Sequence, residues 1–165
     1  MRNKLIDLMV VLAGICMTDI AHAAPATQGF VACGGNHFVR NGSTEEHTAR
    51  YNIRNPNFSG AIVITNVTMY NGNGVQVFSG FPTDPEFKRV VLPLQTSRFT
   101  SNEIGGFLAA GDRPLMTFIS WRSINASPVE EPIIGGVNRG LDTTTGYRVA
   151  EHSLGCRNVP RPVVP

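Results

Sequence analysis

The sequence predicts an all-β domain, an antiparallel sandwich of about seven or eight strands. Short runs rich in β-branched and aromatic residues alternate with glycine, asparagine and proline, which mark turns. No stretch after the N-terminal segment carries a sustained helical period of apolar residues. Regular spacing of short strands is typical of a sandwich, and a small β-barrel is the alternative architecture.

The first 23 residues have the form of a secretory signal peptide. Arg2 and Lys4 precede an apolar run over residues 5–16, and the segment ends in Ala21-His22-Ala23. That run is too short to cross a bilayer, which needs about 20 apolar residues. We therefore expect cleavage after Ala23 and a periplasmic or secreted protein.

Residues 24–159 are long enough for one domain with its own core, and residues 160–165 read as a disordered tail. The full chain has a formal net charge of +2. Removal of two basic and two acidic residues with the signal peptide leaves the value at +2. This balance argues against a nucleic-acid partner, and we expect no transmembrane segment in the mature chain.

The first predicted strand covers residues 48–55, where Ala49, Tyr51 and Ile53 share one face and polar residues the other. A Pro- and Gly-containing turn follows, and residues 61–70 form a central strand. Asn71-Gly72-Asn73-Gly74 then predicts a tight hairpin turn into a strand over residues 75–78, because Asn-Gly pairs tolerate left-handed backbone.

The second half of the chain supplies the other predicted strands. Gly105-Gly106 and Gly111-Asp112 mark loops around an apolar piece at residues 107–110, whose type stays open. The predicted strands cover residues 88–94 and 96–100, which Pro93 separates or bends, and residues 115–124, 133–139 and 147–152.

Several short motifs, in this order and spacing, resemble a family of small exported bacterial domains that has no assigned function. The motifs are Ile53-Arg54-Asn55, a strand that ends at Tyr70 before a turn at Gly74, Gly105-Gly106-Phe107, Ile119-Ser120-Trp121 and Pro132-Ile133-Ile134. The chain departs from the family pattern at Met69-Tyr70-Asn71 and at Gly135. The resemblance implies an exported β-domain and no particular chemistry.

Cys33 and Cys156 are the cysteines that remain after residue 23, and in an exported domain such a pair predicts a disulfide. The alternative is a metal site, because His37 and His152 stand four residues from these cysteines and two Cys with two His suit zinc or copper. The two interpretations exclude each other, since a disulfide consumes the thiolates.

Two acidic pairs are weaker candidates. Glu45 and Glu46 stand next to His47, and with His37 upstream they suggest a carboxylate and histidine metal site. Glu130-Glu131 suggests general acid and base catalysis. Solvated loops are the more common origin of both patterns.

Arginines in the predicted strands suggest a ligand-binding face, although a plain solvated face is the more common outcome. Bidentate arginine contacts would suit a carboxylated or phosphorylated ligand. Trp121 and Tyr70 suggest a stacking platform for a sugar, with core packing as the more common role. The arginines concerned are Arg50, Arg54, Arg122, Arg139 and Arg148.

The chain contains no nucleophile elbow and no phosphate-binding loop. The sequence therefore predicts a non-enzymatic binding or structural module of the cell envelope, without a cofactor. Its partner would be another envelope protein, a surface polymer or a small anionic ligand, and not a nucleic acid. The alternative is a periplasmic zinc- or copper-binding protein.

Overall fold

The computed structural model describes residues 25–39, 44–101 and 115–159. The predicted signal peptide, the glycine-rich loop around Gly105 and the predicted tail lie outside these residues. The described residues form strands and connecting loops, with no α-helix among them. They make two sheets in which every strand pair is antiparallel.

The first sheet has six strands. Its order is β11-β1-β8-β4-β5, and the short strand β6 also pairs with β4. The strands are β1 (Gln28–Gly35), β4 (Ile62–Tyr70), β5 (Gln76–Gly80), β6 (Val90–Val91), β8 (Leu115–Ser123) and β11 (Cys156–Val159).

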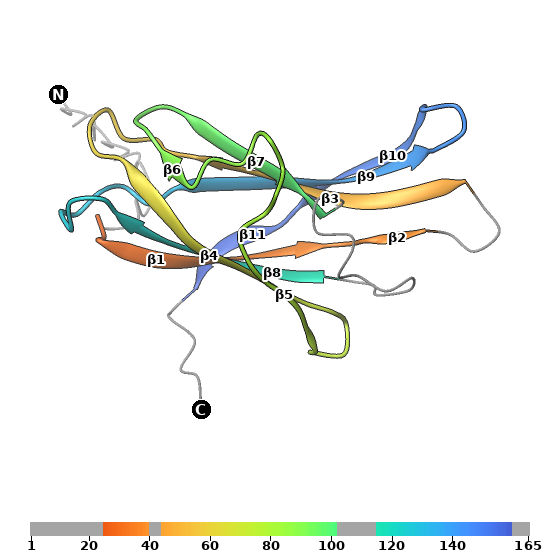
Figure 1. The fold of residues 1–165 in the computed structure, drawn as a ribbon, viewed down its shortest axis with the longest axis horizontal. Coiled ribbons are helices and arrows are strands. Elements are labelled where there is room, and N and C mark those ends of the chain that lie inside the picture. Colours follow the sequence, from red (N-terminus) through yellow and green to blue (C-terminus); the bar gives the residue numbers. More distant parts are fainter. Residues whose placement is uncertain (1–24, 40–43, 102–114, 160–165) are drawn as a thin grey trace, which may run out of the picture.

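The second sheet has five strands in the order β10-β9-β3-β2, and β7 pairs with β3 beyond the end of β2. Figure 1 shows the two sheets stacked face to face, which confirms the predicted sandwich; they do not close into a barrel. The strands are β2 (Phe38–Val39), β3 (Glu45–Arg54), β7 (Thr96–Thr100), β9 (Ile133–Asp142) and β10 (Arg148–Leu154).

The core fills the space between the sheets. On β3, Ala49, Tyr51 and Ile53 are fully buried, as the alternation along this strand predicts. The ring of Tyr51 lies 5.0 Å from that of Phe99 on β7, measured between centroids. Trp121 packs over Gly29 of β1, where an added Cβ would lie 2.7 Å from the indole nitrogen. A side chain at position 29 would therefore displace the tryptophan.

The predicted hairpin after residue 70 is confirmed. The Asn71 side-chain oxygen accepts hydrogen bonds from the backbone N–H groups of Asn73 and Val75, each at 3.0 Å. Gly74 has a φ of 77°, in the left-handed region that glycine tolerates. The turn leads into β5, which pairs with β4.

The described residues contain eleven strands, more than the sequence predicts, chiefly because the sequence analysis does not predict β1 and β11. β1 contains Gly29, Gly34 and Gly35, which in a sequence read as turn signals. In the fold its partners are β8 and β11, both distant in sequence. The predicted strand over residues 88–94 shrinks to β6, because residues 92–95 form a turn closed by the Gln95 N–H to Leu92 O hydrogen bond.

Candidate anion-binding face

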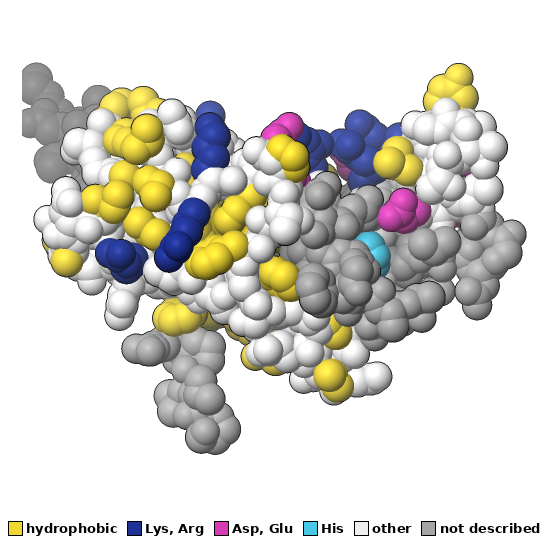
Figure 2. Space-filling view, viewed as in Figure 1, with side chains coloured by type: hydrophobic (Ala, Val, Ile, Leu, Met, Phe, Trp, Pro, Cys, Tyr) yellow, Lys and Arg dark blue, Asp and Glu magenta, His cyan; other side chains and the backbone are white. Residues whose placement is uncertain are grey.

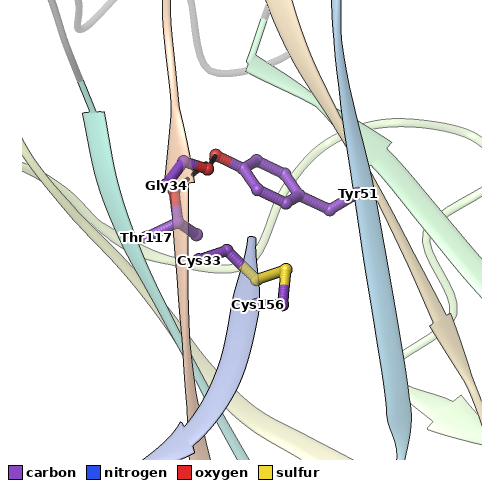
Figure 3. Close-up of a disulfide and its surroundings, with 5 residues drawn as sticks. All are labelled: Cys33, Gly34, Tyr51, Thr117 and Cys156. Carbon is purple, nitrogen blue, oxygen red and sulfur yellow. Dashed lines mark hydrogen bonds between the residues drawn. A yellow bond between two sulfur atoms is a disulfide. The ribbon is translucent and has the colours of Figure 1, made fainter. Parts of the chain in front are cut away.

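The predicted disulfide between Cys33 and Cys156 is confirmed. The two residues lie opposite each other in the antiparallel pairing of β1 and β11, and Cys33 is fully buried (Figure 3). The bond joins positions 123 residues apart. It links β1 to the edge strand β11, which is the last strand of the described residues.

Tyr51 lies beside the disulfide but makes polar contacts of its own, as Figure 3 shows. Its hydroxyl donates to the Gly34 carbonyl at 3.2 Å and lies 2.8 Å from the Thr117 hydroxyl, which is placed to donate in return. Burial raises the pKa of Tyr51 far above its ordinary value, and the hydrogen bond to Thr117 opposes this in part. The phenol therefore stays neutral and ties the two sheets together.

The alternative metal site would need thiolates from Cys33 and Cys156, whose sulfurs are bonded to each other. His37 Nδ1 lies 3.0 Å from the Ser101 hydroxyl, and His152 is exposed on β10. Within the part of the chain that the structure describes, no group of three or more His, Cys, Asp or Glu residues is arranged to hold a metal ion.

The predicted Glu45, Glu46 and His47 cluster is divided by the strand geometry. All three lie on β3, where successive side chains point to opposite faces, so Glu46 points away from Glu45 and His47. His47 pairs with the Glu45 carboxylate. The two glutamates therefore do not form one ligand pair.

Sequence reasoning missed the contact between His37 and Ser101. A serine hydroxyl beside a histidine is the pairing of nucleophile and general base used in nucleophilic catalysis. Ser101 is fully buried, and its hydroxyl oxygen also accepts the Ala49 N–H at 2.9 Å. Because Ser101 is enclosed and already accepts a backbone hydrogen bond, we interpret the pair as structural.

Glu130 and Glu131 lie in the connection between β8 and β9, beside a groove of about 520 Å³. The Glu131 carboxylate accepts a hydrogen bond from the Asn158 amide. Arg157 and the disulfide-bonded Cys156 complete the polar lining, and no histidine, serine or lysine is among the described residues that line this groove. The groove thus offers acidic groups without a nucleophile beside them.

Four arginines form a diagonal line across the outer face of the second sheet. Asn52, Arg50 and Thr48 follow one another along the outer face of β3. The pairing register places Arg98 of β7 opposite Asn52 and Arg139 of β9 opposite Thr48. Such diagonal neighbours in an antiparallel sheet lie about 7–8 Å apart. Arg148 of β10 continues the line beyond Arg139. We call Arg98, Arg50, Arg139 and Arg148 the arginine row.

Within the described residues, three of the four members of this row pair with acidic side chains, and Glu46 of β3 lies on the same face opposite Leu141. Arg98 pairs with Glu86 at one end. At the other end Glu151 accepts from Arg148 at 2.8 Å and lies 3.5 Å from Arg139. Figure 2 shows basic and acidic side chains together at the top of the view, above β7 and β10. Arg50, in the middle, has no carboxylate partner in the described part of the chain.

The side chains of the row lie close to the sheet. The Nε atoms of Arg50, Arg98 and Arg139 are buried and lack a hydrogen-bond acceptor among the described residues. Arg98 and Arg139 keep 31% and 27% of their side-chain surface exposed. Each of these two side chains therefore keeps part of its surface in solvent while its Nε atom is buried against the sheet.

The arginine row differs in three members from the set that the sequence suggested, because it includes Arg98 and lacks Arg54 and Arg122. Arg54 lies on the same face of β3 as Arg50, opposite Thr96, but off the diagonal line. Arg98 belongs to it and was missed, although its place between Ser97 and Phe99 on an alternating strand is a usable signal. Arg122 lies on β8 of the first sheet and does not belong to it. A groove of about 440 Å³ adjoins the row at Arg98, lined also by Asn52, Glu86 and Lys88.

The two aromatic residues suggested as a sugar platform lie apart. Trp121 is buried in the core. Tyr70 lies on the opposite face of the first sheet and packs edge-on against Phe118, with 5.8 Å between ring centroids. The pair does not form a platform.

Comparisons of this chain with models of protein families, with curated proteins and with solved structures found no match.

Proposed function

We propose that the protein is an exported, non-enzymatic module that binds an anionic polymer through the arginine row. The observation that carries this proposal is Arg50, a half-buried arginine in the middle of the row with no carboxylate partner in the described residues. A guanidinium held on a rigid strand presents a planar fork of donors that matches carboxylate and phosphate groups.

The spacing of the row suits a ligand with repeated anionic groups better than a single small anion. Each arginine occupies a different strand, so the positive charges follow a line and do not converge on one point. At its ends the row already pairs with Glu86 and Glu151, both partly exposed. A polyanion displaces such exposed ion pairs at small cost, because surface pairs contribute only about 0–1 kcal/mol.

Two features support the exported location. Disulfides persist in oxidising compartments and are rare in the cytosol, and the protein has one between Cys33 and Cys156. In the described residues, no helix has the length and apolar character needed to span a membrane. Cleavage after Ala23 remains part of the proposal.

The test is binding of the purified chain to a carboxylated polysaccharide, polygalacturonate, measured by calorimetry beside the neutral polymer dextran. Arg50→Gln should weaken binding to polygalacturonate by about tenfold, because it removes one charge-assisted pair of hydrogen bonds. Arg157→Gln is the matched control: it removes the same charge from an exposed position on β11 of the other sheet. Added salt should weaken binding of the original protein.

Equal loss of affinity in both variants would show a general charge effect and overturn the proposed site. Equal binding of dextran and polygalacturonate would overturn the anionic ligand.

A further inference from the structure

Exposed aliphatic side chains gather on the outer face of the first sheet, at the end where β6 joins β4. Val63 stands between Val90 of β6 and Arg122 of β8 in one cross-strand row. Hydrogen bonding of the Ile124 N–H to the Ala61 carbonyl extends the sheet by one more residue. Val90, Leu92 and Ile124 are exposed by 41%, 48% and 42%. We call the exposed Val90, Leu92 and Ile124, together with the partly buried Ala61 and the buried Val63 beside them, the β6 patch.

Leu94 adds a second apolar side chain to the turn that follows β6. The turn runs from Leu92 through Pro93 and Leu94 to Gln95, closed by a 3.0 Å hydrogen bond. Leu94 has a φ of 60° and is 57% exposed. A left-handed conformation is unfavourable for leucine and ordinarily falls to glycine or asparagine. The fold therefore holds an unfavourable backbone conformation at a position whose side chain points into solvent.

The surroundings of the β6 patch are basic. Arg122 stands next to Val63 in the same cross-strand row. Arg89 precedes Val90, and its guanidinium carbon lies 4.4 Å from the centroid of the Phe81 ring. The six strands of the first sheet, all within the described residues, contain no aspartate or glutamate. Figure 2 shows hydrophobic side chains with basic ones among them around β4 and β6, and no acidic side chain in that part of the view.

We infer that the β6 patch and Leu94 dock on the surface of an anionic lipid bilayer. Aliphatic side chains at a protein tip enter the boundary between headgroups and acyl chains, and nearby arginines contact lipid phosphates. The net charge of +2 does not reveal this asymmetry, because the acidic residues that the structure describes lie on the second sheet and in loops, and the strands of the first sheet have none.

A second copy of the chain fits this surface less well. A symmetric contact pairs the same patch on both copies, so it would bring Arg122 and Arg89 near their own equivalents. The strands of the patch offer no carboxylate to compensate these charges. An anionic bilayer supplies the missing negative charge.

The experiment is flotation of a chain that begins at Ala24 with lipid vesicles. This chain contains every strand that the structure describes, and it lacks the apolar run of residues 5–16. Vesicles of phosphatidylethanolamine with phosphatidylglycerol should carry the protein, and vesicles of phosphatidylcholine should carry much less. Arg122→Gln should lower binding to the anionic vesicles about fivefold, since a basic residue near such a surface contributes about 1 kcal/mol.

Leu94→Asn is the decisive variant. Asparagine tolerates the left-handed conformation, so this variant should melt at the same temperature as the original protein or higher while its vesicle binding falls. The matched control is Val75→Ser, at an equally exposed position (57%) beside the β4–β5 hairpin turn, which should leave vesicle binding unchanged.

Three results would overturn the inference: no flotation with anionic vesicles, unchanged flotation of the Leu94→Asn variant, or an equal loss in the Val75→Ser variant. Dimerisation in sedimentation that Leu92→Ser abolishes would assign the patch to a contact between copies. These outcomes do not depend on the arginine row. Arg50 lies on the other sheet, so the Arg50→Gln variant should float with anionic vesicles as the original protein does.

Discussion

The side chains of Asn55 and Asn57 are joined by a hydrogen bond of 2.7 Å from the Asn57 amide nitrogen to the Asn55 amide oxygen. Asn55 is fully buried and donates to the carbonyls of Gly60 and Val91. Asn57 donates to the Glu130 carbonyl and accepts from the Glu130 N–H. Two asparagines thus join the β3–β4 connection, the β8–β9 connection and strand β6.

We expect Asn55→Ala to lower the free energy of unfolding by about 2–4 kcal/mol, because several buried backbone and side-chain groups would lose their partners. Chemical denaturation measures this change. Asn73→Ala, at an exposed position in the hairpin turn, serves as the control and should change stability by less than about 0.5 kcal/mol. Similar stability of the two variants would show that the Asn55 contacts contribute little.

Tyr51→Phe should destabilise the protein by about 1–2 kcal/mol, because it leaves the Gly34 carbonyl and the Thr117 hydroxyl without their partner. The raised pKa of Tyr51 also makes stability pH-dependent. The neutral Tyr51 phenol contributes its full stabilisation below pH 10.0, the ordinary pKa of tyrosine. This stabilisation is lost as the pH rises above 10.0, because the tyrosine ionises first in the unfolded chain. Melting temperatures across alkaline pH should therefore fall less steeply for Tyr51→Phe; parallel curves would contradict this assignment.

Replacement of both Cys33 and Cys156 by alanine should lower stability by about 5 kcal/mol, the value that chain entropy gives for a bond joining residues 123 apart. Chemical denaturation of the double variant and of the reduced original protein, each compared with the oxidised protein, measures this loss. The double variant and the reduced protein should lose similar amounts of stability. A double variant as stable as the oxidised protein would show that the pairing of β1 and β11 does not need the bond.

Asp142 caps the turn between β9 and β10. Hydrogen bonds from the Thr144 N–H, the Thr44 hydroxyl and the Thr145 N–H hold the pKa of its carboxyl below the ordinary 3.8. The ionised Asp142 carboxylate contributes its full stabilisation above pH 3.8. This stabilisation is lost as the pH falls through the lower pKa of the folded state.

Asp142→Asn should therefore reduce the loss of melting temperature on acidification below pH 3.8. Glu130→Gln removes the same charge outside this turn and is the control. An identical acid profile for Asp142→Asn and the original protein would contradict the role of the carboxylate.

The sequence by itself determined the elements whose signals are local. Alternation along β3 identified Ala49, Tyr51 and Ile53 as core, and Asn-Gly pairs identified the hairpin at Gly74, because side-chain period and turn geometry depend on a few neighbouring residues. The even pair of cysteines predicted the disulfide, since its chemistry needs no knowledge of strand order.

Tertiary structure alone decided the pairing of distant strands and everything that depends on it. The glycines of β1 become strand residues only because β8 and β11 lie on either side. Arg98 joins Arg50 and Arg139 in one row, and Arg122 is separated from them, because sheet order and register place residues far apart in sequence side by side. Register is set by long-range packing of the buried face, which no local pattern contains.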